Sequence, residues 1–343
     1  MTSIPEEKLQ DDDFSPLVTI IIPVFNGAAF LRGAIESALG QTYPKIEVIV
    51  VNDGSHDDGA TEHIALSFGD RIRYLSKENG GVSSALNFAI LKMTGDYFSW
   101  LSHDDLYMPG KVSQQIKLLG KHEGGRTIVY SDYSIFTDDA MNDDVSVFMP
   151  GVPPHHFRYW LTSRSALHGC SLLIPRTVFA DVGNFDEGLL STQDYDLWFR
   201  AAKHYSFIHL PEVLVRARSH EGQDTHRKFK AAFKESSNLH LSFVKELSCS
   251  DVPGNSSGEI GRNYLTLASR LWKRGFKEAG SHSAGIAKLC GVSSTRALVV
   301  ALQARFVFWV RQSVVRFLSS ETKHKIRYLF SLVRGIQRGF KIS

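Results

Sequence analysis

The sequence predicts an α/β protein: a mainly parallel, doubly wound sheet with flanking helices, followed by a helical C-terminal region. Two runs of consecutive apolar residues, "LVTIIIPVF" (17–25) and "IEVIVV" (46–51), are short and rich in β-branched side chains. Such runs are typical of strands buried on both faces of a parallel sheet. Helical spacing over 27–40 separates them, and this alternation indicates βαβ units.

The same alternation continues along the chain. In order, we expect a helix over 57–68, a strand over 71–76, a helix over 82–93, a strand over 96–101, a helix over 110–121 and a strand over 127–135. The uneven stretch 137–165 contains acids and prolines, and a long insertion of this kind indicates a functional loop or lid. Beyond it we expect a strand over 167–175, a helix over 194–205, short strands in "FIHL" and "EVLVRARSH", and helices from about 225 onward.

Composition is that of an ordinary globular protein, with 43% hydrophobic and 22% charged residues in 343. The three cysteines, Cys170, Cys249 and Cys290, are far apart and show no zinc-type spacing, so we expect a reducing, cytoplasmic setting. The acidic start has no apolar core of a signal peptide, and we expect a disordered lead over 1–15.

Polar residues follow the predicted strands, where open α/β sheets bind their ligands. Neither Gly-x-Gly-x-x-Gly nor Gly-x-x-x-x-Gly-Lys follows the first strand, which argues against a dinucleotide dehydrogenase and a P-loop enzyme. An acidic, amide-rich rim takes their place. It consists of Asn26, Asp53, Asn79, Asp104 and Asp105.

Two parts of this rim have both a functional and a local structural interpretation. Asp53 could accept hydrogen bonds from a nucleobase or a ribose, but "NDGS" is also an ordinary turn sequence. Gly80 and Gly81 before a helix could offer amide N–H groups to an anion, or they could simply open the helix. Taken alone, both patterns favour the structural interpretation.

Asp104 and Asp105 indicate a cation more strongly. Two adjacent carboxylates after an apolar strand need a cation, protonation or full solvation. Carboxylate oxygens suit Mg²⁺ or Mn²⁺ held together with substrate phosphates. A helix N-cap is the alternative, but one Asp suffices for a cap.

Five motifs in order resemble the family 2 glycosyltransferases with the GT-A fold, over roughly residues 16–226. They are "TIIIPVFNGAAFLRGAIESALGQTY", "VNDGS", "ENGGVSSALNFAILKMTGDYFSWLSHDDLYMPGKV", "VGNFDEGLLSTQDYDLWFR" and "RARSHEGQDT". The resemblance implies a nucleotide-sugar donor, above all a UDP-sugar, and a divalent cation, Mg²⁺ or Mn²⁺. The residues expected at the nucleotide sugar are Pro23, Val24, Phe25, Asn26, Asp53, Asn79, Gly80, Gly81, Asp104 and Arg218. Those expected at the metal are Asp104, Asp105 and His220.

The resemblance also implies an inverting reaction with Asp194, the first Asp of "TQDYDLW", as the general base. Asp194 also has an interpretation as a helix cap, and Asp196 as an acid serving the helix dipole. Three residues depart from the family pattern. They are Ser102 in place of an acid, Gln193 in place of Glu, and Leu86 in place of Arg.

Positive charge is concentrated at the C-terminal end. Residues 301–343 hold nine Lys/Arg and one acid, for a net charge of +8, which leaves −5 on residues 1–300. The stretch 323–342 places its cations on one helical stripe opposite an apolar face, and Phe306 and Arg305 begin a similar pattern over 302–318. Such segments favour a membrane surface, while a helical subdomain packed on the acidic core is the alternative.

The expected organisation is therefore a lead (1–15), a catalytic domain (16–226), a helical extension (227–300) and a basic amphipathic tail (301–343). We expect an acceptor that is a glycan or a lipid-linked glycan, in bacterial surface-polysaccharide synthesis at the inner face of the cell membrane. No nucleic acid is expected, because no recognised binding motif accompanies the charge. Two alternatives are a sugar nucleotidyltransferase, which lacks its basic Gly-rich loop here, and a catalytically silent scaffold at the membrane.

Overall fold

The computed structural model describes residues 14–122, 125–138, 144–164, 166–220 and 229–317. Most of the predicted lead and the whole basic stripe over 323–342 lie outside these ranges. The strands are β1 (Val18–Val24), β2 (Ile46–Asp53), β3 (Arg73–Lys77), β4 (Tyr97–Trp100), β5 (Leu106–Tyr107), β6 (Thr127–Phe136), β7 (Val145–Val147), β8 (Leu172–Pro175) and β9 (Ser206–Arg218). The helices are α1 (Leu31–Leu39), α2 (Ala60–Leu66), α3 (Gly81–Ile90), α4 (Lys111–Leu119), α5 (Phe157–Ser163), α6 (Thr177–Val182), α7 (Gln193–Ala201), α9 (Phe229–Glu246), α10 (Ser257–Lys273), α11 (Lys277–Leu289) and α12 (Ser294–Phe317).

The strands form one sheet in the order β3-β2-β1-β4-β8-β6-β9-β5, with β7 paired to β6. Strands β1, β2, β3 and β4 are mutually parallel. β8 is antiparallel to both β4 and β6, and β6 is parallel to β9. Since two reversals restore the direction, β6 and β9 run the same way as β1 and β4. The carboxyl ends of β1, β2, β3, β4, β6 and β9 therefore lie at one edge of the sheet.

Both faces of the sheet are covered, which confirms the prediction from the continuous apolar runs. All seven residues of β1 are buried. Ile21 belongs to the core on the side of α3 and α7, whereas Ile20 and Ile22 belong to the core on the side of α1 and α4. Because side chains alternate along a strand, a strand sandwiched between helices must be apolar at every position.

Strand β9 differs from the expectation. The sequence predicted two short strands, "FIHL" and "EVLVRARSH", but one strand runs from Ser206 to Arg218. Its pairing with β6 skips between Leu210 and Val213, so that Pro211 and Glu212 have no partner in the register. Proline has no N–H for the ladder, and a bulge accommodates it without ending the strand.

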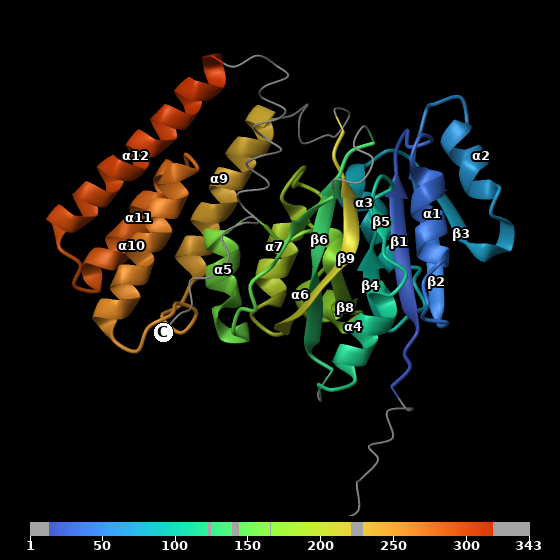
Figure 1. Cartoon of the computed structure of the whole chain (residues 1–343), viewed down its shortest axis with the longest axis horizontal. Helices are drawn as coiled ribbons and strands as arrows, with labels where there is room; N and C mark the ends of the chain where they lie inside the picture. Colours follow the sequence, from blue (N-terminus) through green and yellow to red (C-terminus); the bar gives the residue numbers. More distant parts are fainter. Residues whose placement is uncertain (1–13, 123–124, 139–143, 165, 221–228, 318–343) are drawn as a thin grey trace, which may run out of the picture.

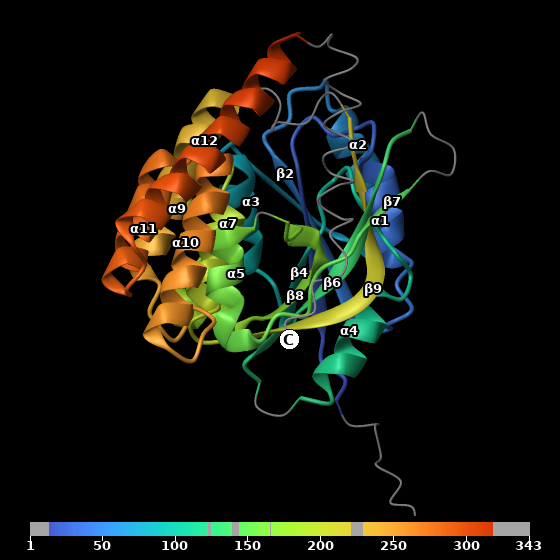
Figure 2. The same cartoon turned by 60° about the vertical axis from the view of Figure 1, so that its left-hand side comes forward.

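The expected loop over 137–165 contains regular structure within its described part. Strand β7 pairs with β6, and helix α5 is buried along its whole length. Figures 1 and 2 show α5 and α7 between the sheet and the helices α9, α10 and α11. The largest apolar core runs without interruption from Ile21 of the sheet to Leu271 of α10.

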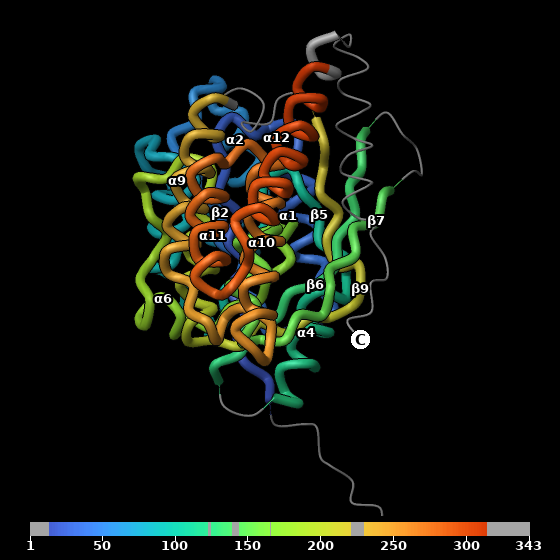
Figure 3. The backbone as a smooth tube through the Cα atoms, turned by 90° about the vertical axis from the view of Figure 1, so that its left-hand side faces the viewer, coloured from blue at the N-terminus to red at the C-terminus, as the bar shows by residue number. Residues whose placement is uncertain are grey.

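Helix α12 packs on this helical region through small residues. Ala301 and Ala304 are buried against Ala268 and Trp272 of α10. The large apolar residues Leu302 and Phe306 point outward and are 58% and 63% exposed. In Figure 3, α12 lies on the outer side of α10 and α11.

Candidate active site

The end of β1 is held against its neighbours by Asn26 and Gly27. Asn26 has a positive φ of 48°; its N–H donates to Ser55 Oγ (2.9 Å) and its Oδ1 accepts from the N–H of His56 (2.8 Å). A Cβ on Gly27 would lie 2.5 Å from the ring of His103, so a larger residue would push β1 away from the loop that carries the two carboxylates. Pro23 and Val24 are buried in β1, while Phe25 and Asn26 are exposed at this edge.

The carboxylate of Asp53 accepts hydrogen bonds from the start of α3. Its Oδ1 accepts from Lys77 Nζ (2.8 Å) and the Gly80 N–H (3.0 Å), and its Oδ2 accepts from the Gly81 N–H (2.7 Å). Asn79 Nδ2 donates to the carbonyl of Asp53 (2.9 Å). The N–H groups of Gly80 and Gly81, expected from the sequence as a possible anion site, therefore donate to the carboxylate of Asp53. Their part in nucleotide binding stays a prediction.

Asp104 pairs with His220, as the order of the strands allows. Asp104 follows β4 and His220 follows β9, and both strands end at the same edge. Asp104 Oδ2 lies 3.1 Å from His220 Nε2. Two ligands at right angles on an octahedral ion with bonds of about 2.1 Å stand about 3.0 Å apart. The pair therefore fits a divalent cation.

Asp105 makes a different set of contacts from Asp104. Its Oδ1 accepts from the Arg218 N–H (2.9 Å). Its Oδ2 accepts from the Cys170 thiol (3.4 Å) and lies 3.6 Å from His168 Nε2. Burial, with the Asp104 charge, raises the pKa of Asp105, and burial also raises the pKa of Cys170. Asp104 thus contacts His220, whereas Asp105 contacts Arg218, Cys170 and His168, and the metal role predicted for Asp104, Asp105 and His220 stays a prediction.

Sequence reasoning missed His168 and Cys170. They lie in "LHGCSLLIP", just before β8, some sixty residues from the two carboxylates. Only the antiparallel insertion of β8 beside β4 brings them to Asp105. Burial lowers the pKa of His168 to about 4, so its ring is neutral at physiological pH.

Arg218 stabilises the loop that carries Asp104 and Asp105. Its Nε donates to the Asp104 carbonyl (2.9 Å) and its guanidinium pairs with Asp138. The guanidinium also lies over the rings of Phe30 and Phe136, 4.6 and 4.5 Å from their centroids. These contacts hold the loop, and the predicted contact of Arg218 with a diphosphate stays a prediction.

Asp194 lies in the first turn of α7. Its first turn is connected to the two carboxylates through the 166–168 loop, where His168 Nε2 lies 3.6 Å from Asp105 Oδ2. Burial raises the pKa of Asp194 to about 6. Tyr195 joins the turn to the 166–168 loop, since its hydroxyl accepts from the Leu167 N–H (2.9 Å).

Glu235 of α9 holds the segment in front of α7. Its Oε2 accepts from the Leu190 N–H (2.8 Å). Its Oε1 accepts from the N–H and hydroxyl of Ser191 and from the Thr192 hydroxyl, at 2.8–2.9 Å. Although burial acts against it, these hydrogen bonds lower the pKa of Glu235. No sequence motif predicts a role for Glu235.

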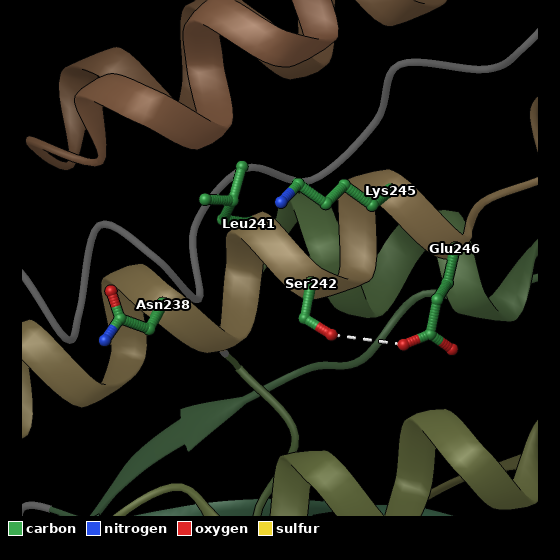
Figure 4. A pocket seen from close by; sticks show the side chains of 5 residues that line it. All are labelled: Asn238, Leu241, Ser242, Lys245 and Glu246. Carbon is green, nitrogen blue, oxygen red and sulfur yellow. Dashed lines mark hydrogen bonds between the residues drawn. The ribbon is translucent and has the colours of Figure 1, made fainter.

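Two hollows lie in the C-terminal helical region. One, of about 390 Å³, is lined by side chains of α9 alone, including Ser242 and Glu246 (Figure 4). The other, of about 700 Å³, is lined by residues such as Trp272, Arg305 and Trp309. Neither of these two hollows is lined by Asp53, Asp104, Asp105 or His220.

Comparisons with known proteins identify a family model and several relatives that match this chain. The glycosyl transferase family 2 model matches residues 19–182. An uncharacterized glycosyltransferase of Rickettsia bellii is 41% identical over 335 residues, covering 92% of this chain and 45% of that protein. One of Rickettsia typhi is 46% identical over 248 residues, covering 70% of this chain and 75% of that protein. Pasteurella multocida chondroitin synthase is 32% identical over 201 residues, covering 58% of this chain and 20% of that protein. The chain spans less than half the length of the Rickettsia bellii relative.

Two solved structures share the fold. Staphylococcus aureus TarS 1–349 in complex with UDP-GlcNAc has a TM-score of 0.57 at 16% identity, covering 93% of this chain and 88% of that chain. The mannosyltransferase PcManGT from Pyrobaculum calidifontis, in complex with GDP-Man and Mn²⁺, has a TM-score of 0.53 at 18% identity, covering 94% and 86%. Likeness at this identity shows the fold alone, which is of the GT-A type.

Proposed function

The chain belongs to glycosyl transferase family 2 and is a glycosyltransferase, and we propose that it transfers a sugar from a nucleotide-diphosphate donor to an acceptor hydroxyl with inversion. Two features of the described residues carry the proposal. These are the Asp104–His220 pair, spaced as ligands of one cation, and Asp194, a carboxyl whose pKa is raised to about 6.

The donor would lie along the ends of β1 and β2. Phe25 and Asn26 are exposed there, and Asp53 orders the turn behind them through the start of α3. A UDP-sugar is the donor that we propose. The two solved structures above were determined with UDP-GlcNAc and GDP-Man, which supports a nucleotide sugar as the ligand class.

Asp104 and His220 would hold the divalent cation, Mg²⁺ or Mn²⁺, that accompanies the diphosphate. When bound, such an ion stabilises negative charge on the departing diphosphate. Asp105 would stabilise the loop that carries Asp104, because Arg218 and Cys170 already donate to its carboxyl oxygens.

Asp194 would accept the proton of the attacking hydroxyl. Cleavage at the anomeric carbon passes through an oxocarbenium-like transition state, and the hydroxyl attacks the face opposite the diphosphate. A positioned carboxylate contributes roughly 10²–10⁴-fold in such a step. A single attack assisted by a single base inverts the anomeric configuration.

For the acceptor we propose a glycan or lipid-linked glycan of a bacterial surface polysaccharide, assembled at the inner face of the cell membrane. The relative named chondroitin synthase supports a polysaccharide product. Among the described residues, no helix combines the length and apolar character needed to cross a membrane. The outward apolar side chains of α12, with Arg305 and Arg311 among them, support docking on a lipid surface.

Substitution of Asp194 tests the role of the base. We expect Asp194→Asn to reduce Mn²⁺-dependent sugar transfer by at least about 100-fold, because an amide cannot take the proton. The matched control is Asp196→Asn, two residues along the same helix, where the carboxylate pairs with Arg200 at 2.7 Å. Equal transfer by wild type and Asp194→Asn would remove Asp194 from the mechanism.

A further inference from the structure

Three buried or half-buried side chains with metal-binding atoms meet behind the loop of the two carboxylates. Asp105, His168 and Cys170 place a carboxylate oxygen, an imidazole nitrogen and a sulfur within 4.8 Å of one another. We infer that these residues form a second cation site, specific for a soft divalent ion such as Zn²⁺ and distinct from the Asp104–His220 pair.

The donor atoms determine the class of ion. Thiolate sulfur favours Zn²⁺ over Mg²⁺ and Mn²⁺, whose protein ligands are mostly oxygen atoms. The Asp104–His220 pair contains no sulfur, so the two sites differ in the ions they prefer. Two cations of different kinds can therefore be bound on the two sides of one loop.

The spacing matches a tetrahedral ion. Asp105 Oδ2 lies 3.4 Å from Cys170 Sγ and 3.6 Å from His168 Nε2. Ligands with bonds of 2.0–2.3 Å to a tetrahedral Zn²⁺ stand about 3.3–3.7 Å apart. The Cys170 sulfur and the His168 ring nitrogen lie within 4.8 Å of each other, so the three atoms can close onto one ion by side-chain movement. The fourth position is left for water or for Ser102 Oγ, 3.6 Å from the sulfur.

Backbone groups already orient two of the ligands. The Ser102 N–H donates to Cys170 Sγ (3.3 Å), and the Arg218 N–H donates to the other oxygen of Asp105 (2.9 Å). Metal ligands in proteins are commonly held by hydrogen bonds of this kind. His168 Nδ1 is buried and has no hydrogen-bond partner among the described residues.

Binding would replace a proton by the ion. The thiol hydrogen of Cys170 now lies between the sulfur and Asp105 Oδ2. An incoming Zn²⁺ would take that position, and the protons of the thiol and of the Asp105 carboxyl would leave to solvent, as coordination by thiolate and carboxylate requires. The ion can enter past His168, whose side chain is 27% exposed, whereas that of Asp105 is 5% exposed.

Cobalt reports this site directly, because Co²⁺ bound to a thiolate gives a near-ultraviolet charge-transfer band. We expect the full-length protein, freed of metal, to give a band that saturates at one Co²⁺ per chain and is removed by Zn²⁺. Cys170→Ser should abolish the band, and His168→Gln should weaken Co²⁺ binding by at least about tenfold. Cys290→Ser is the matched control and should retain it.

The inference is overturned if no band forms or if the band survives in Cys170→Ser. His168→Gln leaves the thiol in place, so its effect remains readable if Cys170→Ser does not fold. Asp104→Asn separates the two sites. It should remove Mn²⁺-dependent donor binding and leave the cobalt band, so a failure of the proposed function and a failure of this site give different results.

Discussion

Asp194 combines two properties that a general base needs, a position at the start of a helix and a raised pKa. Its carboxyl accepts from the Tyr195 N–H (2.8 Å), which favours the charged form, but burial dominates and raises the pKa to about 6. The carboxylate is therefore ionised at pH 7 and still basic enough to accept a proton.

The pH dependence of transfer should follow this carboxyl. We expect kcat/KM to fall as the pH drops below about 6, because protonated Asp194 cannot act as a base. Initial rates from pH 5 to 8 at saturating Mn²⁺ measure this limb. A flat profile down to pH 5 would show that another group takes the proton.

Lys111 is a second titrating residue, and it lies in the core with 0% exposure. Its Nζ donates to Ser99 Oγ (2.5 Å) and to the Leu172 carbonyl (3.1 Å), and burial lowers its pKa to about 7. Between pH 7 and the ordinary lysine pKa, the unfolded chain binds a proton that the folded chain does not. This residue therefore makes stability increase with pH in that window.

Lys111→Met should remove this dependence. From urea unfolding at pH 7 and pH 9, we expect the wild-type free energy of unfolding to rise more steeply than that of the variant, by on the order of 1 kcal/mol per pH unit. Parallel behaviour of the two proteins would mean that Lys111 is protonated in the folded state.

Helix α9 connects the C-terminal helical region to residues 185–192, the segment in front of α7. Phe243 of α9 stacks on Phe199 of α7 with centroids 3.9 Å apart, and Glu235 binds residues 190–192 in front of α7. At the other end of that segment, Asn87 of α3 binds the Phe185 carbonyl (2.9 Å). The turn that carries Asp194 is thus fixed from two sides.

Glu235→Gln should disturb this arrangement selectively. Glutamine can keep the bonds at one oxygen, but its NH₂ group then faces the Leu190 N–H. We expect kcat to fall about tenfold, from the loss of roughly 1.5 kcal/mol of charge-assisted bonding, while the KM for the donor stays unchanged. Glu246→Gln, at the C-terminal end of the same helix, where Glu246 accepts from the Ser242 hydroxyl (Figure 4), is the control. A rise of about tenfold in the donor KM would contradict the expectation that Glu235 acts only by positioning Asp194.

Some elements could be predicted from the sequence and others could not. The apolar runs of β1 and β2 predicted buried parallel strands because burial on both faces requires apolar residues throughout. The sequence predicts two short strands on either side of Pro211, whereas the structure has one strand with a bulge, because a bulge depends on a partner strand that the local sequence does not specify. His168, Cys170 and Glu235 reach the site through pairing and packing that no local pattern encodes.

At the scale of the whole molecule, α12 presents an unusual surface. Its buried side is made of alanines, and its outer side has Leu298, Leu302, Phe306 and Trp309 at 58–63% exposure. The sequence of α12 contains four arginines and no acid. A second copy placed on this face would bring like charges together, whereas an anionic lipid surface would attract them at about 1 kcal/mol per cation.

Vesicle binding tests this surface. We expect the protein to sediment with vesicles that contain anionic lipid and not with neutral ones, and binding should fall as salt rises. Phe306→Ser with Trp309→Ser should weaken it, whereas Leu289→Ser should not, although Leu289 of α11 is even more exposed (88%). Equal binding to neutral vesicles would contradict the electrostatic part of this proposal.

We propose that Asp104 and His220 hold the cation of a nucleotide-sugar donor, and thermal unfolding with a panel of nucleotide sugars measures this binding. Since a ligand that binds only the folded state stabilises it by mass action, about 2.7 kcal/mol at 100 times Kd, one donor should raise Tm when Mn²⁺ is present. Asp104→Asn should lose that rise. An unchanged Tm across the panel, or the same rise in Asp104→Asn, would contradict the claim.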